Sequence, residues 1–72
     1  MKKTYEIEVD CANCANKMEV ASGKVAGVES VSIHYMAQKM TVEFAAGADP
    51  DAVIQDIIKV CRKVERDFEI YL

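Results

Sequence analysis

The chain has 72 residues, 51% of them hydrophobic, and its 9 basic against 12 acidic side chains give a formal net charge of -3. This length supports one domain, residues 1–72, with a hydrophobic core, and it excludes an ATP-hydrolysing machine or a two-lobed active site. The acidic balance disfavours nucleic acids and anionic membrane surfaces as partners, because both are bound through basic faces.

The first part of the chain predicts a strand followed by a helix. Residues 4–9 alternate between apolar and charged side chains, which is the pattern of a half-buried strand. Residues 14–26 predict a helix whose inward stripe contains Cys14, Met18, Ala21 and Val25. Gly27 follows as the expected C-terminal cap of this helix.

The middle of the chain predicts a hairpin and a second helix. Residues 31–35 and 40–44 alternate, and the short link 36–38 joins them. Asp49 is expected as the N-cap of the next helix and Pro50 as its first residue. The apolar stripe of that helix contains Val53, Ile54, Ile57, Ile58, Cys61 and Val64.

Residues 68–72 alternate once more and predict the last strand. The order of elements is therefore β-α-β-β-α-β. This is the ferredoxin-like α+β arrangement, in which two helices cover one face of an antiparallel four-stranded sheet.

The chain has no features of a secreted or membrane-spanning segment. It contains no run of the roughly 20 apolar residues that a span requires, and acidic residues interrupt the start of the chain where a signal peptide would be apolar. A cytosolic location is expected. The 3 cysteines are an odd number, so reduced thiols fit the sequence better than a disulfide framework does.

One motif carries chemistry, the pair Cys11 and Cys14 at the junction of the first strand and the first helix. Two cysteines three positions apart in a first helical turn can direct both sulfurs to one point, and thiolates bind zinc, cadmium, lead and copper(I). The positive end of the helix favours the thiolate forms. Since Cys61 and His34 stand far away in the sequence, the pattern indicates an open site that passes its ion on rather than a closed structural zinc site.

The same spacing also serves thiol-disulfide oxidoreductases. In this chain no aromatic residue adjoins the pair, and the single proline, Pro50, belongs to the second helix. The sequence therefore favours metal transfer over redox catalysis.

Asp10 has two interpretations. It is either the N-cap of the first helix or a third metal ligand. With two thiolates and the Asp10 carboxylate as ligands, the site would carry a net charge of minus one around a divalent ion and minus two around copper(I). Copper(I) also gains little from a hard oxygen ligand. The ligand interpretation therefore favours Zn(II), Cd(II) or Pb(II).

Other potential ligands are assigned to the core or the surface. Cys61 lies on the apolar stripe and is expected in the core; it would approach the metal only if its helix ended early. His34 is expected to be exposed and is not assigned as a ligand. Met18 and Met40 fall on the apolar periods of their elements and are expected in the core.

The run Asp10-Cys11-Ala12-Asn13-Cys14, followed by Ala15, Met18 and Gly27-Val28, resembles the heavy-metal-associated domain family over nearly the whole chain. The resemblance implies the βαββαβ fold and Cys11 and Cys14 as metal ligands. The aspartate before the first cysteine is similar to that of the P-type ATPases that export zinc, cadmium and lead, which implies a ligand role for Asp10.

The chain also departs from the family. Glu8-Val9 replaces the usual Gly-Met, with Val9 expected to fill the core position of the methionine. Residues 63–68 lack the Gly-Tyr pair of many copper-binding members, which again favours a divalent ion.

The sequence thus predicts the N-terminal, cytosolic metal-binding domain of a metal-exporting P-type ATPase, with no catalytic activity of its own. It would bind Zn(II), Cd(II) or Pb(II) through Cys11, Cys14 and Asp10 and surrender the ion by ligand exchange to a membrane-embedded transport domain. A free-standing Cu(I) chaperone and a thiol-disulfide oxidoreductase are the alternatives. The domain is expected as a monomer or as a metal-dependent dimer in which two copies share an ion.

Overall fold

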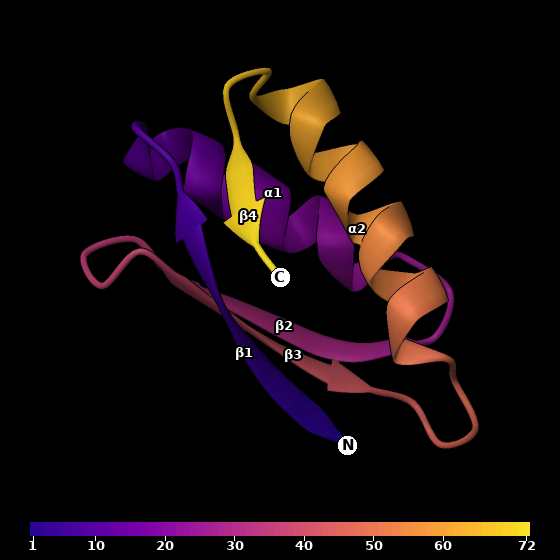
Figure 1. The fold of residues 1–72 in the computed structure, drawn as a ribbon. Helices are drawn as coiled ribbons and strands as arrows, with labels where there is room; N and C mark the ends of the chain where they lie inside the picture. The colour runs from indigo at the N-terminus through magenta and orange to yellow at the C-terminus, as the bar shows by residue number, and fades with distance from the viewer.

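The computed structural model describes all 72 residues as a four-stranded sheet with two helices on one face (Figure 1). The elements in chain order are β1 (Lys2–Glu8), α1 (Ala12–Gly23), β2 (Val28–His34), β3 (Lys39–Phe44), α2 (Pro50–Val64) and β4 (Glu69–Tyr71). The strands lie in the order β2-β3-β1-β4, and every neighbouring pair is antiparallel. The ferredoxin-like prediction is confirmed.

The core lies between the sheet and the helices. Alternate residues of the strands meet the apolar stripe of each helix there, because a strand repeats every two residues and a helix every 3.6. The buried hydrophobic side chains are Ile7, Val9, Ala15, Met18, Met40, Val42, Phe44, Val53, Ile54, Ile57, Ile58, Cys61 and Phe68. The predicted core positions of Val9, Met18 and Met40 are confirmed.

Cys61 belongs to this core, as predicted. It is fully buried, and its Sγ lies 3.3 Å from Ser22 Oγ of α1. Since α2 continues to Val64, the early helix end that would bring Cys61 toward a metal does not occur.

Both predicted ends of the first helix were wrong. α1 begins at Ala12 because Cys11 acts as its N-cap, with Sγ accepting a hydrogen bond from the Cys14 N–H at 3.2 Å. The helix ends at Gly23, and the N–H of Lys24 bonds back to carbonyls of the last turn.

Gly27 is therefore no helix cap. It lies in the connection to β2 with φ at +90°, where a Cβ would approach Val53 Cγ2 to 2.7 Å. A glycine is required there both by the backbone conformation and by the close contact with α2.

The second helix agrees with its prediction. Asp49 caps it, with Oδ1 accepting from the Asp51 N–H at 3.1 Å, and Pro50 is its first residue. Arg62 and Lys63 lie in its last turn, where cations stabilise the negative end of the helix dipole. No helix of the structure is both long and apolar enough to span a bilayer.

The two outer strands differ from the sequence pattern at their ends. β2 begins at Val28 and has an irregularity in its pairing with β3 between Val28 and Ser30. The backbone N–H of Ile33 in β2 donates to a carboxylate oxygen of Glu19 in α1 at 2.7 Å. β4, on the opposite edge, has only 3 residues.

Candidate metal centre

The two motif cysteines lie together at the exposed start of α1. Cys11 is the extended N-cap residue, with φ at -132° and ψ at 119°, and its carbonyl accepts from Ala15 N at 2.9 Å. Cys14 lies in the first turn, and both side chains are half-buried. The structure thus brings these two predicted ligands to one place that solvent reaches.

The two thiols differ in acidity. A hydrogen bond from the Cys14 side chain lowers the pKa of Cys11, and the backbone N–H groups of Cys14 and Asn13 act in the same direction. The same side-chain hydrogen bond raises the pKa of Cys14, together with desolvation and the negative charge of Cys11. Cys11 therefore loses its proton first and presents the first thiolate to an incoming ion.

Alkylation should reveal this order. With limiting iodoacetamide near neutral pH, we expect Cys11 to react several times faster than Cys14, because the thiolate is the nucleophile. Cys61 should react last, since burial raises its pKa and hides its sulfur. Peptide mapping by mass spectrometry measures all three rates in the unmodified protein; equal rates at Cys11 and Cys14 would contradict the assignment.

Asp10 is exposed and does not cap the helix. Its carboxylate accepts no hydrogen bond, while its backbone carbonyl accepts one from the Tyr35 hydroxyl at 3.1 Å. No three His, Cys, Asp or Glu side chains are grouped so as to hold an ion. The structure therefore joins Cys11 with Cys14 but does not gather Asp10, Cys61 or His34 with them, and Asp10 as a third ligand stays a prediction.

Glu65 is a neighbour of the site that sequence reasoning missed. It is the C-cap residue of α2, and its negative charge raises the pKa of both Cys11 and Cys14. Lys17 in α1 opposes it by lowering the pKa of Cys14. The ferredoxin-like topology, which places the end of the second helix near the loop after the first strand, could have identified Glu65 as a neighbour.

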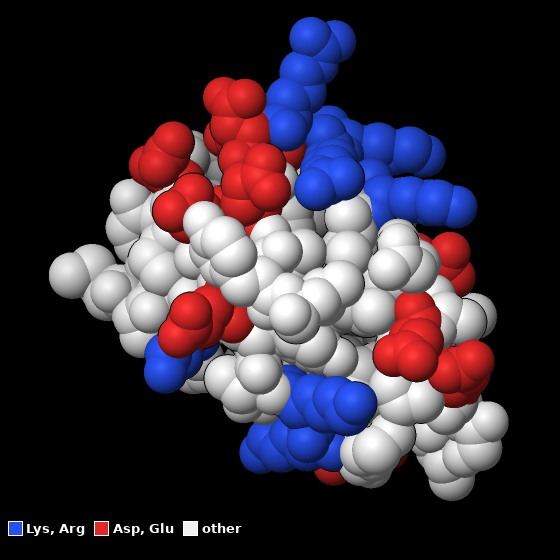
Figure 2. All heavy atoms as spheres, in the orientation of Figure 1, with Lys and Arg blue, Asp and Glu red and all other residues white.

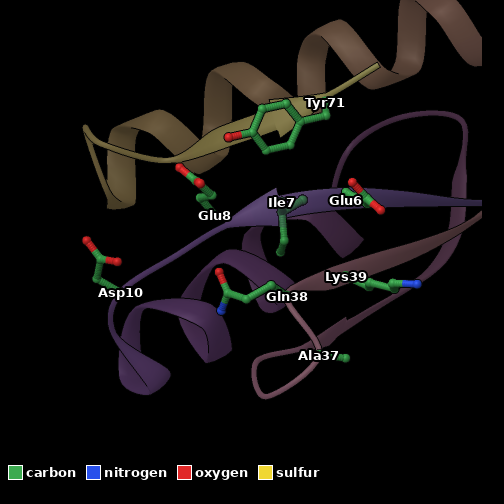
Figure 3. Close-up of a pocket in the computed structure, with 8 residues that line it drawn as sticks. All are labelled: Glu6, Ile7, Glu8, Asp10, Ala37, Gln38, Lys39 and Tyr71. Atoms are coloured by element: carbon green, nitrogen blue, oxygen red, sulfur yellow. The ribbon is translucent and has the colours of Figure 1, made fainter.

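The surface around this end of the molecule is divided by charge. Figure 2 shows the end of the molecule at which α2 ends. Lys and Arg side chains gather on one side of this end, and Asp and Glu side chains gather on the other. A pocket of about 500 Å³ beside Asp10 includes Glu6, Glu8 and Tyr71 in its lining (Figure 3). A hydrogen bond to Glu8, desolvation and the charges of nearby glutamates raise the pKa of Tyr71, while Lys39 brings a positive charge to the same pocket.

The hairpin between β2 and β3 contacts the loop before Cys11. Gln38 makes two hydrogen bonds to the backbone of Val9 through its side-chain amide, at 2.8 and 3.0 Å. In Figure 3 its side chain extends from the hairpin toward that loop. Sequence reasoning treated residues 36–38 only as a link, and no local pattern identifies such a contact.

The comparisons with known proteins agree with this geometry. A family model described as the heavy-metal-associated domain matches residues 4–67. The N-terminal domain of a potential copper-translocating P-type ATPase from Bacillus subtilis, solved in the Cu(I)-loaded state, superposes with a TM-score of 0.74 at 26% identity, covering 99% of this chain and 84% of that one.

Two further solved structures are similar. A copper-binding domain from HMA7, a P-type ATPase, has a TM-score of 0.70 at 27% identity and covers 99% of this chain and 93% of its own. The CopZ metallochaperone has a TM-score of 0.74 at 15% identity, covering 99% of this chain and 100% of its own, and shows the fold alone. The search of curated proteins found no match.

Proposed function

The chain belongs to the heavy-metal-associated domain family, and from this premise we propose that it binds Zn(II), Cd(II) or Pb(II) through Cys11, Cys14 and Asp10. The observation that carries the proposal is the pair of thiols in the first turn of α1, directly preceded by a carboxylate that no hydrogen bond occupies. Thiolates hold a borderline ion strongly, and an exposed carboxylate next to them is free to complete the site.

Charge balance supports a divalent ion. Two thiolates and the Asp10 carboxylate carry three negative charges, and Glu65 adds a fourth nearby. A divalent ion offsets more of this charge than Cu(I) does, and it also makes better use of an oxygen ligand.

Transfer follows from the openness of the site. An ion held by two thiolates and one carboxylate leaves a coordination position for an incoming ligand, so the ion can pass to a partner without first entering water. We propose that the partner is the membrane-embedded transport domain of a P-type ATPase, since the similar domains from Bacillus subtilis and HMA7 belong to such ATPases. We place the domain in the cytosol, where thiols remain reduced.

A Cu(I) site is the second candidate. Two observations favour it: the similar structures are described as copper proteins, and the structure assembles only two ligating side chains. Two thiolates suit a soft monovalent ion without any oxygen ligand.

Asp10 separates the two candidates. We expect Asp10→Asn and Asp10→Ala to lower the affinity for Zn(II) by about tenfold or more, equal to about 1.4 kcal/mol, and to leave the affinity for Cu(I) nearly unchanged. Competition titrations of the reduced protein, followed by thiolate ultraviolet absorbance, measure both affinities.

Asp56→Asn is the matched control for that titration. It removes the same charge from an exposed position on α2, away from the motif, and should leave both affinities unchanged. If Asp10→Asn leaves the Zn(II) affinity at the control value, Asp10 is no ligand and the Cu(I) site becomes the better assignment.

A further inference from the structure

The tip of the β2–β3 hairpin holds the loop that leads into the metal centre. Gln38 Oε1 accepts from the Val9 N–H at 2.8 Å, and Gln38 Nε2 donates to the Val9 carbonyl at 3.0 Å. The Tyr35 hydroxyl donates to the carbonyl of Asp10, the next residue, at 3.1 Å. Two side chains of one hairpin therefore bind two consecutive residues directly before Cys11.

These contacts extend the sheet past the point where its backbone pairing ends. The last paired residues of β1 and β3 are Glu6 and Lys39, and one further backbone bond runs from Ile7 N to the Gln38 carbonyl at 3.0 Å. Beyond it, the Gln38 amide offers one acceptor and one donor to Val9, as a neighbouring strand would. The backbone of Val9 is thereby held against the hairpin after β1 has ended.

The backbone of Gln38 adopts an unfavourable conformation at this position. Its φ is +54°, and it is the one residue other than glycine with a positive φ. Glycine or asparagine would be the usual choice for such a turn. The long amide is instead placed over Val9 and fixed by a third hydrogen bond, from Nε2 to the Tyr35 carbonyl at 2.7 Å, so the strain accompanies a specific set of contacts.

We propose that Tyr35 and Gln38 are positioning residues of the metal centre. They hold the backbone of Val9 and Asp10, and thereby keep Cys11 beside Cys14 before an ion arrives, so that less loop order has to be gained on binding. Neither residue touches the ion. The inference rests on the proposed function, because it assigns the hairpin to the same site.

Two substitutions remove the contacts while sparing the turn. Gln38→Asn keeps an amide and a residue that tolerates positive φ, but it is one methylene too short to reach Val9. Tyr35→Phe removes only the hydroxyl. Thr41→Val is the matched control, since it deletes a cross-strand hydrogen bond to Thr4 of 3.2 Å in the same sheet.

The experiment has two readouts, one of them independent of metal. In the metal-free protein, amide hydrogen exchange at Val9, Asp10 and Cys11 should accelerate in the double variant Tyr35→Phe/Gln38→Asn. The affinity for Cd(II), measured against a chelator by thiolate absorbance, should fall by about tenfold, as is typical for partners that orient metal ligands. Thr41→Val should change neither quantity.

The outcomes separate this inference from the proposed function. Unchanged exchange and affinity in the double variant would overturn the positioning role, and so would an equal loss in Thr41→Val. If Cys11→Ser/Cys14→Ser still binds Cd(II) as the unmodified protein does, the proposed function is wrong and the positioning role falls with it. If binding needs the thiols and is indifferent to the hairpin, only the positioning role is wrong.

Discussion

Replacing Cys11 and Cys14 together with serine is expected to lower the affinity for Zn(II) and Cd(II) by about 1,000-fold or more, because two thiolates supply most of the binding free energy. The fold should persist. Neither residue belongs to the buried core, and serine at position 11 can still accept the hydrogen bond that caps α1. Metal titration combined with thermal unfolding of the metal-free variant measures both effects.

Cys61 provides the matched control for this pair. Cys61→Ala should leave the affinity unchanged but lower the stability, because it removes a fully buried sulfur from the core. Unfolding of the Cys11→Ser/Cys14→Ser variant under conditions where the unmodified protein is folded and metal-free would contradict a transfer site. That result would indicate thiols with a structural role.

Phe68→Ala is expected to have the largest effect on stability, with a loss of about 3–5 kcal/mol. Phe68 is fully buried directly before β4, and its N–H donates to the Glu65 carbonyl at 3.1 Å. A domain of this size has a total stability of roughly 4–11 kcal/mol. The variant should therefore lose a large part of its free energy of unfolding and unfold at a markedly lower urea concentration, since β4 loses the side chain that anchors it.

Urea unfolding followed by circular dichroism tests the Phe68 prediction. Leu72→Ala is the control: it also truncates a large apolar side chain near β4, but one that is 75% exposed, so its free energy of unfolding should change by about 0.5 kcal/mol or less. Similar losses in the two variants would show that Phe68 does not anchor β4.

The fold could be predicted because its signals are local and repeated. The alternation of the strands and the stripe of α2 identify their own buried faces, and Asp49 with Pro50 marks the start of α2. The start of α1 was missed because its N-cap is Cys11, an uncommon cap whose Sγ accepts from the Cys14 N–H, whereas the sequence offered Asp10 as the possible cap. A sulfur acceptor is weaker than a carboxylate, and the usual cap preferences therefore do not identify it.

The candidate site could be predicted only in part. Cys11 and Cys14 are close in sequence, so their spacing alone predicts that their sulfurs meet. Glu65 and Gln38 reach the same loop from distant parts of the chain, and their roles depend on how α2 and the hairpin are placed. No periodicity reports such long-range contacts, which arise from tertiary packing.

The hydrogen bond between Ile33 and Glu19 is also expected to make pairing of the β2 edge with another molecule less favourable. β2 is an edge strand, and a free N–H on its outer side would invite pairing with a strand of another molecule. The Glu19 carboxylate occupies that N–H and adds a negative charge to the edge, and the irregular pairing near Val28 disturbs the same strand. The opposite edge, β4, is too short to serve as a template. Copies of this domain at high local concentration, including tandem copies in one polypeptide, are therefore expected to resist amyloid-like pairing of their edge strands.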